Sequence, residues 1–427
     1  QLEYKNMLSK NNLLNTILNN NIDFLEKNDQ ISKNKIIESI NNGTMVLLGN
    51  INHKNVKPVL IGQPAKVKVN ANIGTSPLIC SHKEEMEKLQ ILEKAGADTY
   101  MDLSIGGDLD AIRKDMINSS SLPIGTVPLY AAAKHNADKG RTIEQLDFEE
   151  VFDEIEKQAE MGVDFMTIHT GITCEAAAYA EKNRILGVVS RGGSMISRWI
   201  LKNNKENPLF TEFDRIVKIA AKHNVTLSLG DSLRPGACAD AGDYPQISEV
   251  SHLGIQAKYA FENGVQVMIE GPGHVSLDEV ESQIKTIKKL TYNAPLYILG
   301  PLVIDNSPGY DHISGAIGAA AAVMAGADFL CYLTPAEHLT LPNKEDVYNG
   351  VMASKIAAMA GDTALKRKYA LDMQNNMSKM RQKLDWQGMK EYALDKDIID
   401  KRRESHKDKA ECAMCGEFCS VKLQHNN

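Results

Sequence analysis

The fold is decided by Val265-Gln266-Val267-Met268-Ile269, which runs directly into Glu270-Gly271-Pro272-Gly273-His274. The first five residues are almost continuously apolar, as is typical of a strand in a parallel sheet that is buried on both faces. The next five combine two glycines and a proline with a carboxylate and an imidazole. This order predicts a buried strand whose carboxyl end carries reactive groups.

The same order recurs through the middle of the chain. Amphipathic segments such as Glu84–Ala95 and Phe148–Met161 separate most of nine candidate strands, which are Val67–Ile73, Thr99–Leu103, Pro123–Val127, Phe165–His169, Gly187–Ser190, Thr226–Gly230, Val265–Glu270, Leu296–Gly300 and Phe329–Leu333. Strands that alternate with helices predict an α/β fold with a parallel sheet. Nine is close to the eight strands of a (β/α)8 TIM-like barrel, so we expect one candidate to lie outside the barrel. An open doubly wound sheet is the alternative, and the lack of a strand–GxGxxG–helix unit counts against it.

The two ends of the chain have a different pattern. Residues 1–66 combine helical periodicity with two short strands, Thr44–Leu48 and Pro58–Gly62, which predicts a small N-terminal α+β cap. We expect the catalytic barrel over residues 67–360 and a C-terminal helical tail with a cysteine cluster motif over residues 361–427. The charged stretch Asp395–Lys409 has little to bury, so we expect it to be a mobile tether.

Composition excludes several classes of protein. The chain has 427 residues, is 43% hydrophobic and 24% charged, and carries a formal charge of -7. An acidic chain without a dense Lys/Arg stripe argues against a nucleic-acid partner. The most membrane-like run, Gly315–Leu333, carries Asp328 and is better explained by a packed helix followed by a buried strand. We therefore expect a soluble, cytoplasmic protein with no membrane partner.

Polar or glycine-rich residues follow one strand candidate after another. In a barrel, the carboxyl ends of all strands open into one mouth, where active sites lie. Ser190-Arg191-Gly192-Gly193 precedes a helical run, and a helix N-terminus with an arginine favours a phosphate. A glycine-rich turn with a surface arginine is the plainer alternative. Arg234, in a loop that Pro235 and Gly236 restrict, is a second cation for the same mouth.

Histidines also follow the strand candidates. His169, His274 and His338 come after three different strands, so their imidazoles can meet at a metal, as can Glu270 and Glu337. The alternative is that these histidines bind substrate or backbone groups instead.

Seven cysteines divide into two sets. Cys80, Cys174, Cys238 and Cys331 are scattered, and we interpret them as ordinary small apolar residues in a reducing compartment. Cys412, Cys415 and Cys419 lie within eight residues, a spacing that lets three thiolates surround one metal centre. An iron–sulfur cluster with one open iron is one interpretation, and a zinc closed by His406 or His425 is the other.

Several motifs that occur in order carry a family resemblance. They are Val69-Asn70-Ala71-Asn72-Ile73-Gly74, Met101-Asp102-Leu103-Ser104, Pro123-Ile124-Gly125-Thr126-Val127-Pro128-Leu129-Tyr130, Val189-Ser190-Arg191-Gly192-Gly193-Ser194, Ile269-Glu270-Gly271-Pro272-Gly273-His274, Pro308-Gly309-Tyr310-Asp311-His312 and Leu341-Pro342-Asn343-Lys344-Glu345-Asp346. With the terminal cysteines, the set resembles the phosphomethylpyrimidine synthase (ThiC) family of thiamine biosynthesis over about residues 44–420.

The resemblance implies a radical S-adenosylmethionine enzyme, a carbon–carbon lyase. It implies a homodimer of (β/α)8 barrels that converts 5-aminoimidazole ribonucleotide into the pyrimidine phosphate of thiamine and releases formate and carbon monoxide. A four-iron four-sulfur (4Fe-4S) cluster, S-adenosylmethionine and zinc are the implied cofactors. A reductant such as flavodoxin or ferredoxin is the implied partner.

The resemblance also assigns roles to residues by motif. It implies cluster ligands that take part in catalysis at Cys412, Cys415 and Cys419, and zinc ligands at His274 and His338. Glu270 is implied in both catalysis and substrate binding. The other implied contacts of the ribonucleotide are Asn72, Met101, Tyr130, His169, Ser190, Arg191, Gly192, Asp231, Arg234 and Tyr297.

The chain departs from the family pattern at three places. The second gap of the cysteine motif holds three residues where four are usual. Ser232 stands where glycine is expected, and Asp305-Asn306-Ser307-Pro308 replaces Asp-Ile-Ala-Pro. Two alternatives therefore stay open. One is the related 5-hydroxybenzimidazole synthase of anaerobic cobamide synthesis, which uses the same substrate and cofactors. The other is a zinc-dependent barrel lyase that uses no radical.

Overall fold

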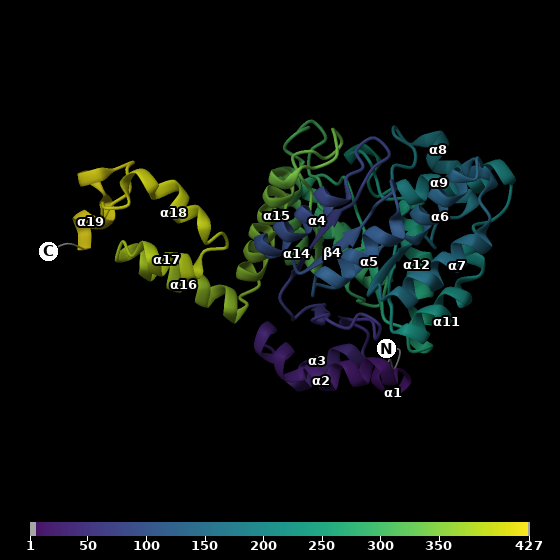
Figure 1. Cartoon of the computed structure of the whole chain (residues 1–427), viewed down its shortest axis with the longest axis horizontal. Helices are drawn as coiled ribbons and strands as arrows, with labels where there is room; N and C mark the ends of the chain where they lie inside the picture. The colour runs from purple at the N-terminus through teal and green to yellow at the C-terminus, as the bar shows by residue number, and fades with distance from the viewer. Residues whose placement is uncertain (1–5, 426–427) are drawn as a thin grey trace. The chain divides into compact units, whose positions relative to one another are not determined.

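Eight parallel strands close into a barrel in the computed structural model, which describes residues 6–425 (Figure 1). In order around the barrel they are β3 (Lys68–Ile73), β4 (Thr99–Asp102), β5 (Ile124–Thr126), β6 (Phe165–Ile168), β7 (Thr226–Leu229), β8 (Val267–Gly271), β9 (Leu296–Leu299) and β10 (Phe329–Cys331). β10 pairs with β3 and closes the ring. The expected (β/α)8 fold is confirmed, and the open-sheet alternative is wrong.

Large aromatic side chains fill the centre of the barrel. Phe165 and Phe329 are fully buried and meet edge to face, with ring centroids 6.2 Å apart. Tyr297 stacks on Phe329 at 4.3 Å. The interior is therefore a packed core, and a ligand can enter only at an end of the barrel.

The strand expected at Gly187–Ser190 does not exist. These residues form an irregular segment that ends in Ser190, the N-cap of α9 (Arg191–Asn203). The apolar signal had another cause: Val189 lies so close to Gly236 that a Cβ at that position would approach a Val189 methyl carbon to 2.4 Å. The segment packs on a loop at the barrel mouth instead of joining the sheet.

Carboxylates fasten the amino ends of neighbouring strands. Asp98, Asp164 and Asp328 each precede a strand, and each accepts a bond from a backbone N–H at the start of the preceding strand. The donors are Val69, Ile124 and Leu296, at 2.8 Å in each case. A buried N–H without an acceptor is costly, so these bonds fix the register of neighbouring strands at the amino-end side of the barrel.

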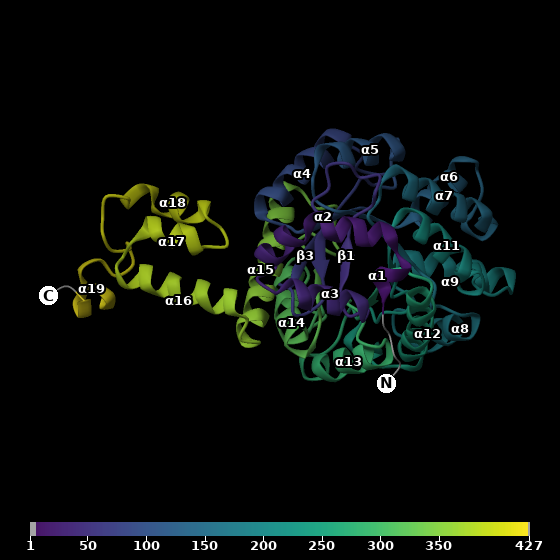
Figure 2. The same ribbon diagram turned by 90° about the horizontal axis from the view of Figure 1, so that it is seen from below.

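Helices surround the barrel (Figure 2). Beside α9 they are α4 (His82–Ala95), α5 (Leu109–Ser119), α6 (Pro128–Asp138), α7 (Phe148–Met161), α8 (Cys174–Asn183), α10 (Pro208–Thr211), α11 (Phe213–His223), α12 (Tyr244–Glu262), α13 (Leu277–Leu290), α14 (Asp311–Ala325) and α15 (Lys344–Ala364). Several begin at side-chain caps, as where Asp243 accepts a bond from the Gln246 N–H at 3.1 Å. The helices are thus set by local sequence as well as by their apolar faces.

The opening residues cover the amino ends of the strands, as Figure 2 shows. They form α1 (Met7–Lys10), α2 (Asn12–Asp29), α3 (Lys33–Asn41) and the antiparallel pair β1 (Val46–Leu48) and β2 (Val59–Ile61). Leu14, Leu18 and Ile36 form their core. Asn50 donates to the carbonyls of Ala159 and Val163, both at 2.8 Å, and so joins this layer to the barrel. Residues 1–5 lie outside the described part.

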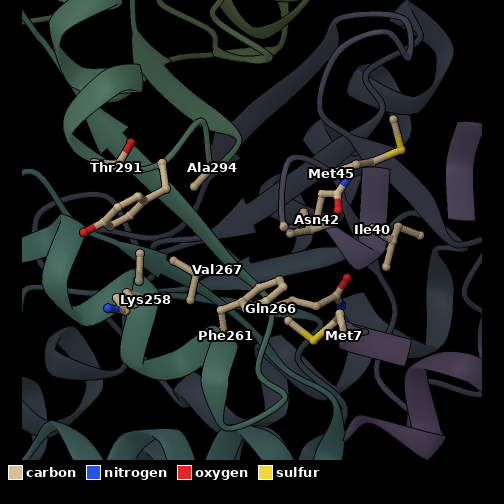
Figure 3. A pocket seen from close by; sticks show the side chains of 14 residues that line it. Met7, Ile40, Asn42, Met45, Lys258, Phe261, Gln266, Val267, Thr291 and Ala294 are labelled. Carbon is tan, nitrogen blue, oxygen red and sulfur yellow. The ribbon is translucent and has the colours of Figure 1, made fainter. Parts of the chain in front are cut away.

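An apolar cavity lies where this layer meets the barrel (Figure 3). Met7, Ile40 and Met45 line it from the N-terminal layer, and Phe261 and Val267 line it from the barrel. Among the described residues that line it, no acidic side chain faces a basic one or a histidine. The chemistry that the sequence predicts lies at the opposite, carboxyl ends of the strands.

The residues from Met359 onward form a second compact unit. Within it lie α16 (Lys368–Gln382), α17 (Trp386–Tyr392), α18 (Asp397–Arg403) and α19 (Ser420–His425). Arg403 packs 3.8 Å from the Trp386 ring and donates to the Lys409 carbonyl at 2.6 Å. The expectation of a mobile tether at Asp395–Lys409 is therefore wrong, because Arg403 gives this charged stretch a folded centre. No helix among residues 6–425 is both long and apolar enough to cross a membrane.

Candidate active site

The carboxyl ends of the barrel strands open into a cavity of about 930 Å³. Its walls include Arg191, Arg234, His274, Glu337 and His338. A narrower inner chamber shares Asn72, Tyr130 and Arg234 with it and lies against the barrel core. Eight of the residues expected to bind substrate line this chamber: Asn72, Met101, Tyr130, His169, Asp231, Arg234, Glu270 and Tyr297. Side chains from four barrel strands, and from the segments that follow three others, thus meet in one place.

The remaining three expected residues begin α9 beside the chamber. Ser190 caps the helix by accepting a bond from the Gly193 N–H at 3.2 Å, and its hydroxyl lies 3.2 Å from His169 Nε2. A Cβ on Gly192 would lie 2.3 Å from the His169 ring, so only glycine fits there. The Arg191 guanidinium lies 5.0 Å from the centre of the Tyr130 ring. A helix N-terminus and a cation therefore face the same cavity.

Arg234 is the second cation of the mouth. Its Nη1 donates to Asp231 Oδ1 at 2.8 Å, and its side chain is about one quarter exposed to the cavity. Among the described residues, its Nη2 and Nε groups make no hydrogen bond and remain for a ligand. Two guanidinium groups in one cavity suit an anionic group such as a phosphate.

Two buried carboxylates occupy the inner chamber. Burial, with the nearby Asp231 carboxylate, raises the pKa of Glu270 to about 7. Hydroxyl bonds from Ser228 and Thr167, both 2.6 Å long and both to Oε1, act in the opposite direction. Burial also raises the pKa of Asp231, against the effect of Arg234. A carboxyl group with a pKa near 7 is able to hold or release a proton at working pH.

His169 is a neutral imidazole. Burial, with the charge of Arg234, lowers its pKa to about 3. Its Nε2 faces Ser190, whereas Nδ1 is buried and has no hydrogen-bond partner among the described residues. An unpaired buried nitrogen on the wall of a chamber awaits a polar group of a ligand.

The structure brings His274 and His338 together. Their ring centroids are 5.6 Å apart. Each ring has its Nδ1 near a carboxylate, 2.8 Å from Asp305 for His274 and 3.3 Å from Asp311 for His338. This pattern fixes the tautomer that leaves Nε2 free for a metal, as in histidine–zinc sites. His338 also has a left-handed backbone (φ 61°), a conformation that is uncommon for residues other than glycine. The donor set fits zinc.

Cys331 is a further residue of the inner chamber that was not predicted to belong to the site. It ends β10, lines the inner chamber and accepts a bond from Asn72 Nδ2 at 3.1 Å. Burial raises the pKa of its thiol to about 12, which keeps it protonated. It is thus buried and uncharged, as predicted for an ordinary small apolar residue, and it also lines the chamber. The rule that strand ends supply the site would have included it, because its strand was predicted at Phe329–Leu333.

The cysteine motif lies in the second unit. Cys412, Cys415 and Cys419 are placed on successive tight turns, where the Gly416 N–H donates to the Cys412 carbonyl and the Phe418 N–H donates to the Cys415 carbonyl. The backbone N–H groups of Cys415 and Met414 lower the pKa of the Cys412 thiol. Stabilised thiolate is the form that binds a metal, so the motif fits a metal centre. His406 is bonded to Ser405 through Nδ1, and the side chain of His425 lies outside what the structure describes.

Glu156, Glu160 and His223 form another group with the donor spacing of a cation site, on the outer surface of α7 and α11. Lys222 already pairs with Glu156 at 2.7 Å and with Glu160 at 3.5 Å. These carboxylates therefore have a cation of their own, and the group lies apart from the mouth.

Together, the fold and the mouth define a class: a (β/α)8 barrel enzyme whose cavity gathers two arginines and a pair of histidines that could hold a metal, and whose chain also carries a cysteine motif that could hold one. Comparison with known proteins agrees. The profile of the family described as "Radical SAM ThiC family" matches residues 11–426. The chain belongs to the radical SAM ThiC family.

Relatives support this membership along nearly the whole chain. The chain is 48% identical over 412 residues to the phosphomethylpyrimidine synthase of Carboxydothermus hydrogenoformans, with 96% of each chain covered. It is 47% identical over 403 residues to the protein of the same name from Pyrococcus abyssi, with 94% of each covered. Membership in a radical S-adenosylmethionine family favours the iron–sulfur interpretation of the cysteines over the closed zinc site.

Solved structures with a similar arrangement are more distant. A dihydropteroate synthase of Coxiella burnetii, in complex with pteroic acid, aligns with a TM-score of 0.42 at 10% identity, covering 72% of this chain and 96% of that one. A likeness at this level carries no argument about the site.

Proposed function

We propose that this protein is a phosphomethylpyrimidine synthase. It converts 5-aminoimidazole ribonucleotide into 4-amino-5-hydroxymethyl-2-methylpyrimidine phosphate for thiamine biosynthesis. The observation that carries the proposal is the convergence of eleven expected ribonucleotide contacts on one chamber and its rim. The names of relatives 46–48% identical to the chain support it.

The chamber suggests how the ribonucleotide lies. Its phosphate belongs near Arg191 and Arg234, beside the N-terminus of α9, because both arginines line the outer cavity. Its imidazole belongs at the inner end, where Asn72, Met101 and Tyr297 meet. Glu270 then holds or accepts a proton at the ribose or the base, since its pKa of about 7 suits both states.

The implied cofactors have residues that fit them. Cys412, Cys415 and Cys419 would hold a 4Fe-4S cluster, and His274 and His338 would hold zinc, with Asp305 and Asp311 orienting the rings. A reduced cluster held by these cysteines, together with S-adenosylmethionine, would supply the carbon radical that the reaction needs. A flavodoxin or ferredoxin as reductant, a homodimer and a cytoplasmic location complete the proposal.

Binding of the ribonucleotide tests the proposal without any turnover. The wild-type protein should bind 5-aminoimidazole ribonucleotide more tightly than the riboside that lacks the phosphate. Arg191→Ala should weaken ribonucleotide binding by roughly 1.5–3 kcal/mol, the range for a hydrogen bond to a charged group. Calorimetry would measure both. Arg198→Ala, on the same helix but paired with Glu144 on the surface, is the matched control. Equal affinity for nucleotide and riboside would sink the assignment.

Zinc binding tests the metal site. Asp305→Asn should lower zinc affinity by about tenfold or more, the usual effect of losing a carboxylate that orients a metal histidine. Competition with a chromogenic chelator measures it. Asp214→Asn, which removes an exposed carboxylate paired with Lys218, should leave zinc affinity as it was. An unchanged zinc affinity in Asp305→Asn would remove this residue from the site.

A further inference from the structure

Arg234 stands on a loop that has no regular structure of its own. The loop follows β7 and runs from Asp231 to Gly236, so helix or sheet hydrogen bonds hold none of its middle residues. A loop of this kind would ordinarily let a long side chain wander. Two buried side chains that lie outside the cavity, Glu249 and Arg184, hold it in place.

Glu249, on α12, holds the N–H side of the loop. Its Oε1 accepts a bond from the Ser232 N–H at 2.9 Å, and its Oε2 accepts a bond from the Leu233 N–H at 2.7 Å. The residue is 2% exposed. Burial raises the pKa of Glu249 to about 8, and the two N–H groups act against that rise. A buried carboxylate is costly, so its use to bind two loop amides indicates that their placement matters.

Arg184, which follows α8, holds the carbonyl side. Its Nη2 donates to the Leu233 carbonyl at 2.7 Å, and its Nη1 donates to the Arg234 carbonyl at 3.3 Å. Asp243, the N-cap of α12, binds the same guanidinium through both oxygens, at 2.7 and 2.8 Å. The side chain of Arg184 is 1% exposed. The planar guanidinium thus joins α8, α12 and the loop in one fixed geometry.

We propose that Glu249 and Arg184 are positioning residues that set Arg234 for the phosphate of the substrate. They grip the backbone at Ser232, Leu233 and Arg234 from opposite sides, and neither lines the cavity. The loop is thus already ordered before a ligand binds, so the binding free energy is not reduced by the cost of ordering it. The proposal rests on the proposed function, because it assumes a phosphorylated substrate at Arg234.

The charge of Arg184 is not what acts on the substrate. Asp243 neutralises it at hydrogen-bond distance, and its remaining donors end on backbone carbonyls. A long-range electrostatic effect would survive exchange for lysine, whereas a geometric grip would not. Lysine keeps the charge but lacks the fork that reaches Asp243 and two carbonyls together.

The test compares ligands with and without the phosphate. Variants Arg184→Lys and Glu249→Gln are titrated calorimetrically with 5-aminoimidazole ribonucleotide and with its riboside, in the full-length protein without S-adenosylmethionine. We expect the dissociation constant for the ribonucleotide to rise about tenfold in both variants, the scale of one lost charged hydrogen bond. The constant for the riboside should stay within about twofold. In turnover, KM should rise while kcat at saturation holds.

Two further variants keep the result decisive. Glu154→Gln neutralises another buried carboxylate, on α7, which lines neither cavity, and should leave both constants within about twofold. Asp243→Asn loosens Arg184 without removing either grip, and serves if the first variants fold poorly. A purely structural role would lower the melting temperature and leave ribonucleotide affinity intact, which would overturn the inference. Equal weakening of both ligands would also overturn it. Failure of the wild type to prefer the nucleotide would instead count against the proposed function.

Discussion

Replacing Cys415 with Ala should abolish the cleavage of S-adenosylmethionine and leave the barrel folded. Cys415 is exposed on the turn that leads from Cys412 toward Cys419, and the motif supplies three thiolates. An iron–sulfur cluster with one open iron needs all three thiolates as ligands, so the loss of one prevents the cluster from binding or distorts it. The loss should exceed 100-fold, on the scale of catalytic groups that act as a unit.

The measurement is formation of 5′-deoxyadenosine after anaerobic reconstitution and reduction, with iron content determined on the same sample. The melting transition of the barrel should stay at the wild-type temperature, since the motif and the barrel belong to different units of the chain. Cys174→Ala is the matched control, because that thiol bonds only the Lys205 carbonyl on the surface of the barrel. Retained cleavage in Cys415→Ala would remove the cluster from this motif.

Glu270→Gln should abolish turnover and, at neutral pH, make the protein more stable. Burial raises the pKa of Glu270 from 4.5 to about 7 in the folded chain. Between these two pH values the unfolded chain has released a proton that the folded chain still holds. Raising the pH through this window therefore destabilises the wild type, and the glutamine variant lacks this loss. Above pH 7 the variant should gain about 3 kcal/mol.

Denaturant unfolding at a series of pH values measures this effect. The difference between variant and wild type should be near zero below pH 4.5, grow as the pH rises to about 7, and stay constant above it. Glu154→Gln serves as the control for neutralising a buried carboxylate elsewhere, because Arg113 and Lys157 pair with that residue. A glutamine variant less stable than wild type at pH 8 would show that Glu270 is held as a favourable ion, not as a strained one.

The barrel was predictable because its signal is local. Runs such as Val265–Glu270 are apolar on both faces, and helices separate them. Each βα unit can therefore be recognised from its own residues. The fifth candidate, Gly187–Ser190, failed because an apolar pair packed on a loop has the same sequence signature as a short strand. Only hydrogen-bond partners, which sequence does not reveal, separate the two cases.

The residues that line the inner chamber were predictable for a related reason. A barrel sends every strand end to one mouth, so Asn72, His169 and Glu270 had to lie near one another once the fold was known. The supporting contacts were beyond reach. Arg184 lies far from Arg234 in sequence, and Glu249 lies on the α-helix that follows it. Nothing in the sequence around either residue indicates that it contacts the loop of Arg234. Such contacts depend on tertiary packing, which a single sequence does not encode visibly.

The measurement that tests the central claim most directly is an anaerobic product assay. The purified protein is reconstituted with iron and sulfide, reduced, and supplied with S-adenosylmethionine and 5-aminoimidazole ribonucleotide, and the products are identified by mass spectrometry. The account predicts 4-amino-5-hydroxymethyl-2-methylpyrimidine phosphate together with 5′-deoxyadenosine. Hydroxybenzimidazole in its place, or no product from a protein that binds zinc but no iron, would contradict it.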